Sequence, residues 1–274
     1  MNALIEATLD SLLERIENGE GDWIKEWVGG GAPKNYTTNK YYTGINTLLL
    51  WSSKQLNQYP TQEWATYKQW QAEGYQVRQG ERSTTILLVR DAVKKGGDIA
   101  NEEDRYRLLK SFSVFNAAQL TAPPASAVVE LTEFQKEDRC EATIRATCAK
   151  IHLEMQPAYA PGPDVILMPP PHAFADPAAY YCTMFHELTH WTGHKSRLLR
   201  GLKYAEEELV AELGAAFLSA QHEIPFTSDN SAAYLRNWLK KVEGDKGRAL
   251  MSAASAATKA ADFIMKFKEV SDVG

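Results

Sequence analysis

Apolar and polar residues alternate along this chain with two different periods, which predict its helices and strands. Apolar residues three or four positions apart predict an amphipathic helix from about Leu4 that ends near Gly19, and further helices over residues 45–57 and 61–73. Runs rich in β-branched and aromatic residues predict strands over residues 84–90 and 106–115. The first half of the chain is therefore expected to be an α+β unit.

The second half of the chain is expected to be mostly helical. Its apolar spacing predicts helices over residues 134–152, 232–242 and 249–267, besides two that carry the motifs described below. The run from Asp164 to Met168 predicts a strand, which could line a cleft and pair with an extended peptide or simply be buried. Prolines between Ala122 and Ser126 indicate a linker, so we expect two domains, at residues 1–122 and 127–274.

The composition is typical of a globular protein. Of the 274 residues, 44% are hydrophobic and 24% are charged, which is sufficient for a packed core. No stretch approaches the roughly 18 apolar residues that a membrane span needs, and the first residues lack a basic segment followed by an apolar one. Three cysteines without metal-ribbon spacing suit a reducing compartment, so a cytoplasmic protein without a membrane partner is expected.

The net charge of −5 hides a basic region that is rich in aromatic rings. Residues 34–95 contain nine lysines and arginines against four acidic residues, a local balance of +5, with six tyrosines and three tryptophans. Cations that follow phosphates and rings that stack on unpaired bases are typical of surfaces for single-stranded nucleic acid. For single rings, such as Trp51, Trp64 and Trp70, a place in the core is the favoured alternative. The candidate DNA-binding residues are Lys34, Tyr36, Lys40, Tyr41, Tyr42, Arg78 and Arg82.

The segment from His186 to His190, which reads His-Glu-Leu-Thr-His, is the strongest chemical signal in the chain. On a helix, positions i and i+4 share a face, so both imidazoles can bind one Zn²⁺, and Glu187 is placed to act as the general base. Asp176 and Pro177 predict where this helix begins. The motif predicts a metal-dependent hydrolase of the zincin type, with Zn²⁺ as the expected cofactor and another divalent ion such as Mn²⁺ as the alternative.

A catalytic zinc site generally uses three protein ligands, and the next predicted helix offers carboxylates for the third position. Glu208 and Glu212 lie four residues apart and share a face of that helix. We favour Glu208 as the ligand and Glu212 as the carboxylate that orients a ligand histidine, and the reverse assignment stays open. Glu206 and Glu207 are expected to be solvated.

Two other side chains could compete as the third ligand. His194 lies four residues beyond His190, but Gly193 is expected to end the helix and turn that imidazole away. Cys182 lies one helical turn before the motif, where a buried small residue is the better interpretation. Tyr204 or His194 could stabilise an oxyanion.

The order of motifs along the chain resembles one family. Trp27, Pro33 and Asn35 are followed by Tyr-Thr-Gly-Ile-Asn at 42–46, Gly-Tyr-Gln-Val-Arg at 74–78, Val-Phe-Asn at 114–116, the histidine motif and the glutamate-rich helix at 207–218. This combination resembles the ArdC antirestriction proteins of conjugative plasmids over most of the chain.

The resemblance implies an N-terminal domain that binds single-stranded DNA and a C-terminal zincin-like metallopeptidase domain, which together protect incoming plasmid DNA from host restriction. It carries His186, Glu187 and His190 onto the metal and base roles, and a glutamate of the segment 208–212 onto the third-ligand role. Single-stranded DNA is the expected partner, with a host restriction enzyme or another DNA-bound protein as a further candidate.

Two other functions stay open from the sequence. The first is a cytoplasmic metallopeptidase that acts on DNA-associated proteins, for which Glu187→Gln would abolish function while DNA affinity and metal content remain. The second is a DNA-binding protein whose metal is purely structural. In that case Glu187→Gln would be harmless, whereas His186→Ala would destabilise the fold because lost metal binding is lost folding free energy.

Overall fold

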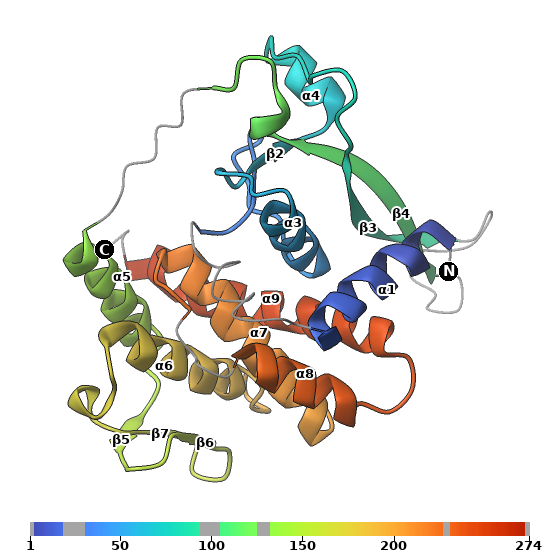
Figure 1. The fold of residues 1–274 in the computed structure, drawn as a ribbon. Coiled ribbons are helices and arrows are strands. Elements are labelled where there is room, and N and C mark those ends of the chain that lie inside the picture. Colours follow the sequence, from blue (N-terminus) through green and yellow to red (C-terminus); the bar gives the residue numbers. More distant parts are fainter. Residues whose placement is uncertain (1–2, 19–30, 94–104, 125–131, 227–230, 272–274) are drawn as a thin grey trace.

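The structure, a computed structural model, describes residues 3–18, 31–93, 105–124, 132–226 and 231–271. A mixed sheet with short helices forms the N-terminal part, and a helical bundle with a small sheet forms the C-terminal part (Figure 1). The fold is therefore α+β, as the sequence predicts. The predicted loop at residues 95–98 and the end of the predicted linker lie outside the described residues.

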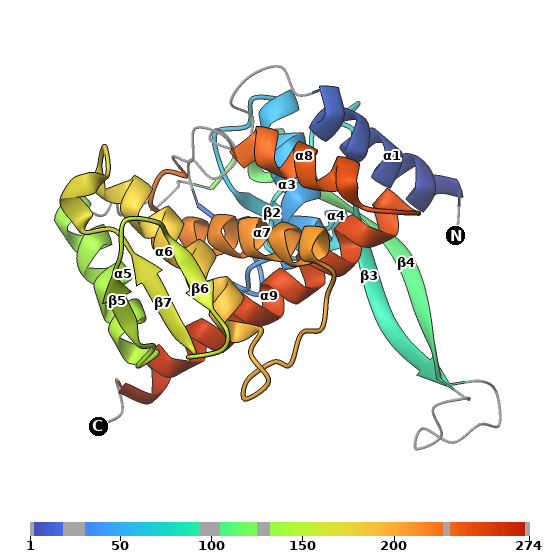
Figure 2. The same cartoon turned by 90° about the horizontal axis from the view of Figure 1, so that it is seen from below.

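The N-terminal sheet has four strands in the order β1 (Lys34–Asn35), β2 (Glu63–Ala65), β4 (Arg105–Asn116) and β3 (Thr84–Val93). β1 and β2 are parallel, and the other neighbours are antiparallel. Strands β3 and β4 form a long hairpin that extends away from the helices (Figure 2). Both strands confirm the sequence prediction and run a few residues further than it.

Two helices pack beside this sheet, α3 (Ile45–Leu56) and α4 (Tyr67–Ala72). The side chain of Asn46 joins α3 to β3, because its amide donates to the Leu87 carbonyl at 2.7 Å and accepts from the Leu87 N–H at 2.7 Å. The helix predicted over residues 61–73 is wrong in its first half. Trp64 pairs with Asn116 in the sheet, so the chain is extended there, and α4 begins only after Thr66, whose hydroxyl caps it.

The C-terminal part contains α5 (Glu133–Ala146), α6 (Pro177–Thr192), α7 (Tyr204–His222), α8 (Ser231–Lys241) and α9 (Lys246–Ser271). Helix α7 lies at its centre, in contact with the other four. Gly214 allows α7 to approach α6 closely, since a Cβ at this position would lie 2.4 Å from Thr189 Oγ1. The two helices that carry the predicted metal ligands are therefore held in direct backbone proximity.

A three-stranded sheet covers one side of α6, in the order β5 (Ile151–Leu153), β7 (Val165–Met168) and β6 (Ala158–Ala160) (Figure 2). The helix predicted over residues 134–152 ends instead at Ala146, and its last residues form β5. Short 3₁₀ helices at Ala117–Gln119 and Pro171–Ala173 complete the described elements.

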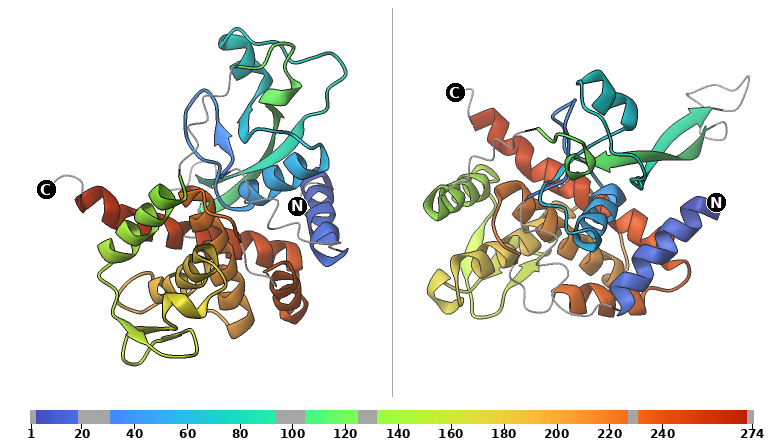
Figure 3. Two further views of the ribbon diagram at one scale, coloured as in Figure 1. Left: turned by 60° about the vertical axis from the view of Figure 1, so that its left-hand side comes forward. Right: turned by 45° about the horizontal axis from the view of Figure 1, so that its top comes forward.

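Helix α1 (Ala3–Asn18) packs against the last two helices of the chain, α8 and α9 (Figure 3). Ile5, Leu9, Leu12 and Ile16 of α1 are buried in the same apolar cluster as residues of α3, α6, α7 and α9. The division at residues 122 and 127 into two domains stays a prediction. None of the described helices is long and apolar enough to cross a membrane.

Candidate metal centre

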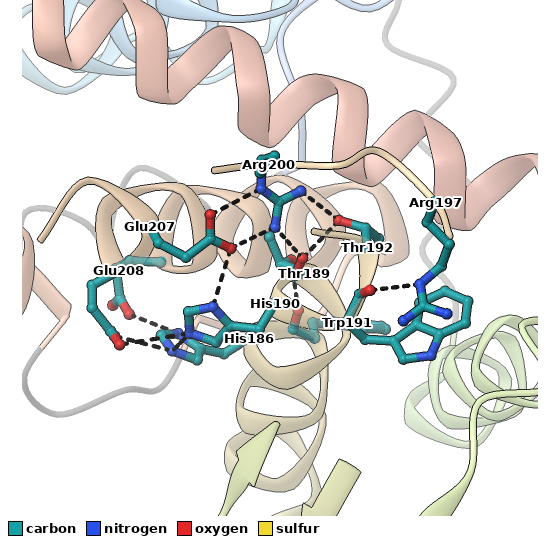
Figure 4. A network of polar contacts seen from close by, with 11 residues as sticks. His186, Thr189, His190, Trp191, Thr192, Arg197, Arg200, Glu207 and Glu208 are labelled. Carbon is teal, nitrogen blue, oxygen red and sulfur yellow. Dashed lines mark hydrogen bonds and ion pairs between the residues drawn. The ribbon is translucent and has the colours of Figure 1, made fainter. Parts of the chain in front are cut away.

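Helix α6 presents the two histidines of the motif side by side. The helix begins as predicted, because the Asp176 carboxylate accepts a hydrogen bond from the Ala179 N–H at 2.8 Å and Pro177 takes the first helical position. One turn before the helix ends, the Nε2 atoms of His186 and His190 lie 3.2 Å apart and face the same point (Figure 4).

The first turns of α7 bring a carboxylate to the same point. The Glu208 oxygens lie 3.6 Å from His186 Nε2 and 3.7 Å from His190 Nε2. A tetrahedral ion bound at about 2.0–2.1 Å requires ligand atoms about 3.3 Å apart, so these three donors fit a metal after a shift of a few tenths of an ångström. His186, His190 and Glu208 thus form a candidate site for a divalent metal.

Each histidine has a second carboxylate on its other ring nitrogen. Glu212 Oε2 lies 3.3 Å from His186 Nδ1, and Glu207 Oε1 lies 3.3 Å from His190 Nδ1. Such carboxylates fix the tautomer and the ring orientation so that Nε2 remains free for a metal. Glu212 therefore lies where an orienting carboxylate is expected, on the far side of the ring from Glu208.

The expectation that Glu207 is solvated is wrong. Arg200, which lies between α6 and α7 and whose side chain is 8% exposed, donates to both Glu207 oxygens, from Nε at 3.0 Å and from Nη2 at 2.6 Å (Figure 4). The same guanidinium donates to Thr192 Oγ1 and to the Thr189 carbonyl, both at 2.6 Å. It thereby joins the end of α6 to the start of α7. Gly193 leaves room for it, since a Cβ there would lie 2.9 Å from Arg200 Nη2.

The composition of α7 could have predicted that Glu207 is paired. From Leu209 onward this helix is buried on almost every side, and a carboxylate in such a helix is generally paired. Its partner could not be predicted, because Arg200 lies in an irregular segment whose path has no periodicity.

Charge and burial oppose each other at His186. Burial lowers the pKa of its imidazole, but hydrogen bonds to Glu208 and Glu212 outweigh this effect and raise that pKa to about 10. The pKa of Glu208 is lowered, because the two histidines outweigh its own burial. The carboxylates thus concentrate negative charge around the point that the histidine nitrogens face, which favours a cation there.

Glu187 borders a pocket of about 560 Å³ together with His186, His190 and Glu208. It is only 7% exposed, and burial raises the pKa of its carboxyl although the two histidines oppose this. Tyr204 lines the same pocket, and a hydrogen bond joins its hydroxyl to Glu208. The pocket therefore combines a metal-type donor set with a carboxyl whose proton affinity is increased.

The two competing ligands considered from the sequence, His194 and Cys182, are not part of the group of three converging donors. His194 also lines the pocket, but its Nδ1 is 2.7 Å from Ser196 Oγ and 3.9 Å from Asp164, and it is outside the three-residue donor group. Cys182 is buried with its sulfur 3.5 Å from Ser219 Oγ. The interpretation of Cys182 as a buried small residue agrees with this position.

Comparisons with known proteins agree with these features. A family described as zincin-like metallopeptidase matches residues 138–256, and the N-terminal domain of anti-restriction factor ArdC matches residues 2–115. The metal-free crystal structure of the antirestriction ArdC protein from plasmid R388 is 34% identical, with a TM-score of 0.81 over 97% of this chain and 98% of that one. This chain belongs to the ArdC antirestriction family.

Other members and relatives extend the family. The Mn(II)-bound structure of the R388 protein is 35% identical, with a TM-score of 0.76 over the same shares of both chains. Uncharacterized protein y4eC of Sinorhizobium fredii (strain NBRC 101917 / NGR234) is 30% identical over 95% of this chain and 91% of its own length. Two proteins of Escherichia coli named DNA primase TraC are 33% and 31% identical over 96% of this chain, which spans only 27% and 20% of their lengths.

The strand of the small sheet that borders the pocket beside His186, His190 and Glu208 is not the one that the sequence of this ArdC relative suggests. β7, the strand expected to line the cleft and pair with a peptide, is the central strand and is flanked by β5 and β6 on both edges. It has no free edge, so pairing with a peptide there is wrong. The edge strand β6 borders the pocket instead, through Ala158 and Tyr159.

The aromatic rings of the basic region divide into packed and exposed ones. Trp51, Trp64 and Trp70 are at most 1% exposed, which confirms the core interpretation for these three. Tyr36 packs on Trp70 with ring centroids 4.8 Å apart, and the hydrogen bond between the Tyr36 and Tyr75 hydroxyls is the main reason that the pKa of the Tyr36 phenol rises to about 12. The half-buried Tyr42 accepts a hydrogen bond from Asn35 at 2.9 Å, so these candidate rings also serve the fold.

The other DNA-binding candidates lie in two places. Lys34 begins β1, and Lys40 and Tyr41 lie on the segment that follows it; Tyr41 is 49% exposed, and the Lys34 ammonium lies 5.9 Å from the centre of its ring. Arg78 and Arg82 lie on the segment before β3. Arg78 is bound to Glu81 and to the Leu120 carbonyl, whereas the side chain of Arg82 is exposed. The role of these residues in DNA binding stays a prediction.

Proposed function

We propose that this protein binds single-stranded DNA and carries a metallopeptidase centre, and that it protects incoming plasmid DNA from host restriction. His186, His190 and Glu208 hold the metal, and the convergence of their donor atoms with Glu187 in one pocket carries the proposal. When bound, the metal would polarise a carbonyl and acidify water. The family favours zinc, while the R388 relative is described with Mn(II), so both ions are candidates.

Glu187 is the general base in this proposal. Its raised pKa suits a group that takes a proton from the attacking water and returns it to the leaving amine. The exposed edge of β6 offers backbone groups to an extended peptide, which would lie across the pocket beside Glu187. Tyr204 lines the same pocket, and its hydroxyl would donate to an oxyanion after releasing its hydrogen bond to Glu208.

The pocket favours catalysis over a purely structural metal. Structural zinc sites are closed by four protein ligands, whereas catalytic sites keep an open position. Here the described residues supply three converging donors next to a pocket of about 560 Å³ that holds a buried carboxyl. A structural metal needs neither the pocket nor Glu187.

Binding of DNA is supported by the family and by the exposed cations of the N-terminal part. The relatives named DNA primase indicate that this type of chain occurs in proteins that work on DNA. Protection by cleaving a restriction enzyme or another DNA-bound protein requires Glu187, whereas protection by covering the strand does not, and the proposal is for cleavage. The alternative is a metallopeptidase for which DNA binding only delivers the active site.

The test is protection of a plasmid transferred as a single strand into a restricting recipient that produces Glu187→Gln. The expected result is loss of protection with unchanged metal content and unchanged affinity for a labelled oligonucleotide. Glu243→Gln, which removes a carboxylate that is 85% exposed, is the matched control and should protect normally. Full protection by Glu187→Gln together with unfolding of His186→Ala would replace the catalytic proposal by the structural-metal one.

A further inference from the structure

A second cavity, of about 670 Å³, lies between α1, α3 and the segment that leads into β3. It is separate from the metal pocket and shares none of its lining residues. The three elements that surround it lie close together at the N-terminal side of the molecule (Figures 1 and 3). Its volume is in the range of ligand-binding pockets.

Two arginines line this groove, and neither has a carboxylate partner among the described residues. Arg15 of α1 is half-buried and donates to the hydroxyl and the carbonyl of Ser52 on α3. Burial lowers the pKa of its guanidinium, which reflects the cost of desolvating an uncompensated cation. Arg82 is exposed, while its backbone is held in place by a 2.8 Å hydrogen bond from Gln119 to its carbonyl.

The remaining polar surface of the groove suits an anion. Seven serine and threonine side chains line it, of which Thr8, Ser52, Ser53 and Thr84 already have a hydrogen-bond partner in the protein: Thr8, Ser11, Ser52, Ser53, Ser83, Thr84 and Thr85. The four acidic residues of α1, Glu6, Asp10, Glu14 and Glu17, are absent from the lining because they project from other faces of the helix. Glu81 does line it, but its carboxylate is bound to Arg78 and Gln119. Arginine and hydroxyl groups are the usual contacts of phosphate oxygens.

Apolar groups complete the groove. Leu56, at the end of α3, is 65% exposed, and Tyr59 lies beside it in the lining. Such a surface can contact the sugar or the base of a nucleotide while the phosphate faces the arginines. An acidic peptide would use the arginines but would leave the exposed apolar surface of Leu56 without a partner.

We infer that the groove between α1, α3 and β3 binds the phosphodiester backbone of single-stranded DNA, with Arg15 and Arg82 as its cations. This inference rests on the proposed DNA-binding function and gives it a site. Of the residues predicted from the sequence as DNA-binding, only Arg82 belongs to the groove. Arg15 was not predicted, because on the sequence it is one charged residue on an amphipathic helix far from the basic region.

The test measures the affinity of the whole protein for fluorescein-labelled oligothymidylate by anisotropy, between 50 and 200 mM salt, for Arg15→Gln, Arg82→Gln and the double variant. Each lost phosphate contact on a single strand lowers the slope of log affinity against log salt by about 0.7, which is roughly eightfold in affinity at 50 mM salt. Arg145→Gln on α5, whose side chain is 70% exposed, changes the charge equally and should bind normally. Arg15→Lys should recover part of the affinity that Arg15→Gln loses.

The outcomes separate the inference from the proposed function. If the unmodified protein does not bind the oligonucleotide, the DNA-binding function itself fails. If it binds and both Arg82→Gln and Arg15→Gln bind like Arg145→Gln, DNA binding stands and the groove is not its site. Equal displacement of the oligonucleotide by polyglutamate would also overturn the inference in favour of an acidic protein partner. Arg82 is exposed, so its variant is informative even if Arg15→Gln is unstable.

Discussion

Replacing Gly214 by alanine should disturb the metal centre, because Gly214 lies where α7 packs closely on α6, the helix that carries the two histidines. The new Cβ would lie 2.4 Å from Thr189 Oγ1 and 2.5 Å from Thr189 Cγ2. Since carbon atoms in contact lie about 3.5–4.0 Å apart, relief requires a movement of about 1 Å. Rotation of Thr189 offers little relief, because both γ atoms are too close and its hydroxyl donates to the Phe185 carbonyl at 2.7 Å. The helices must therefore separate.

The cost follows from two opposing effects. Overpacking costs about 1–3 kcal/mol, and the better helix propensity of alanine returns up to about 1 kcal/mol. We expect a net loss of about 1–2 kcal/mol, which lowers the melting temperature by roughly 2–8 °C. Separation of α6 from α7 also moves Glu208 away from the two histidines, so metal affinity should fall by about 10- to 100-fold, as when groups that support metal ligands are altered.

The assay combines thermal unfolding of the metal-free protein with competition for Zn²⁺ or Mn²⁺ against a chelator. Gly201→Ala is the control, since a Cβ at Gly201 meets nothing within 4 Å. Thr189→Ala removes the clashing atoms, so combining it with Gly214→Ala should restore most of the lost metal affinity, a coupling that a double-mutant cycle measures. A Gly214→Ala variant with the melting temperature and the metal affinity of Gly201→Ala would refute this reasoning.

Two further predictions concern the charges around the metal. Arg200→Met leaves Glu207 half-buried without its cation, so we expect a loss of roughly 3 kcal/mol in unfolding free energy and a 10- to 100-fold loss of metal affinity; equal affinity in a chelator competition would contradict this. Glu208 and Glu212 raise the pKa of His186 from 6.5 to about 10 against the effect of burial, so the charged imidazole stabilises the metal-free fold below pH 6.5, and this contribution is lost as the pH rises through about 10. Metal binding needs the neutral imidazole, so metal affinity should increase between pH 6 and 9, and binding should release a proton. Calorimetry in two buffers of different ionisation enthalpy measures both effects. The absence of both would contradict this prediction.

The metal centre was largely predictable because its geometry is local. Spacing within a helix alone places His186 and His190 on one face, and the same rule pairs Glu208 with Glu212 on the next helix. What the spacing could not predict is which carboxylates turn toward the histidines, since this depends on how α6 and α7 pack. Glu207 was misassigned for that reason, as its position depends on Arg200 in the segment between the helices.

The fold class and most elements were predictable from periodicity, whereas short strands and the exposure of single rings were not. Trp64 lies in a stretch with helical apolar spacing, yet it joins the sheet because Asn116, far along the chain, pairs with it. Tyr36 has the sequence surroundings of an exposed loop, yet its ring covers Trp70. In both cases a partner distant in sequence decides the outcome, and local patterns carry no information about such partners.

The contact of α1 with α8 and α9 makes the beginning and the end of the described chain neighbours. Because their apolar side chains join one cluster, cutting the polypeptide between residues 122 and 132 would not by itself separate the sheet-bearing piece from the metal-bearing piece. The two pieces would remain associated as a nicked protein, held together by the apolar contacts of α1. A DNA strand that enters the groove beside Arg15 and displaces α1 would therefore also remove the contacts of α1 with α8 and α9.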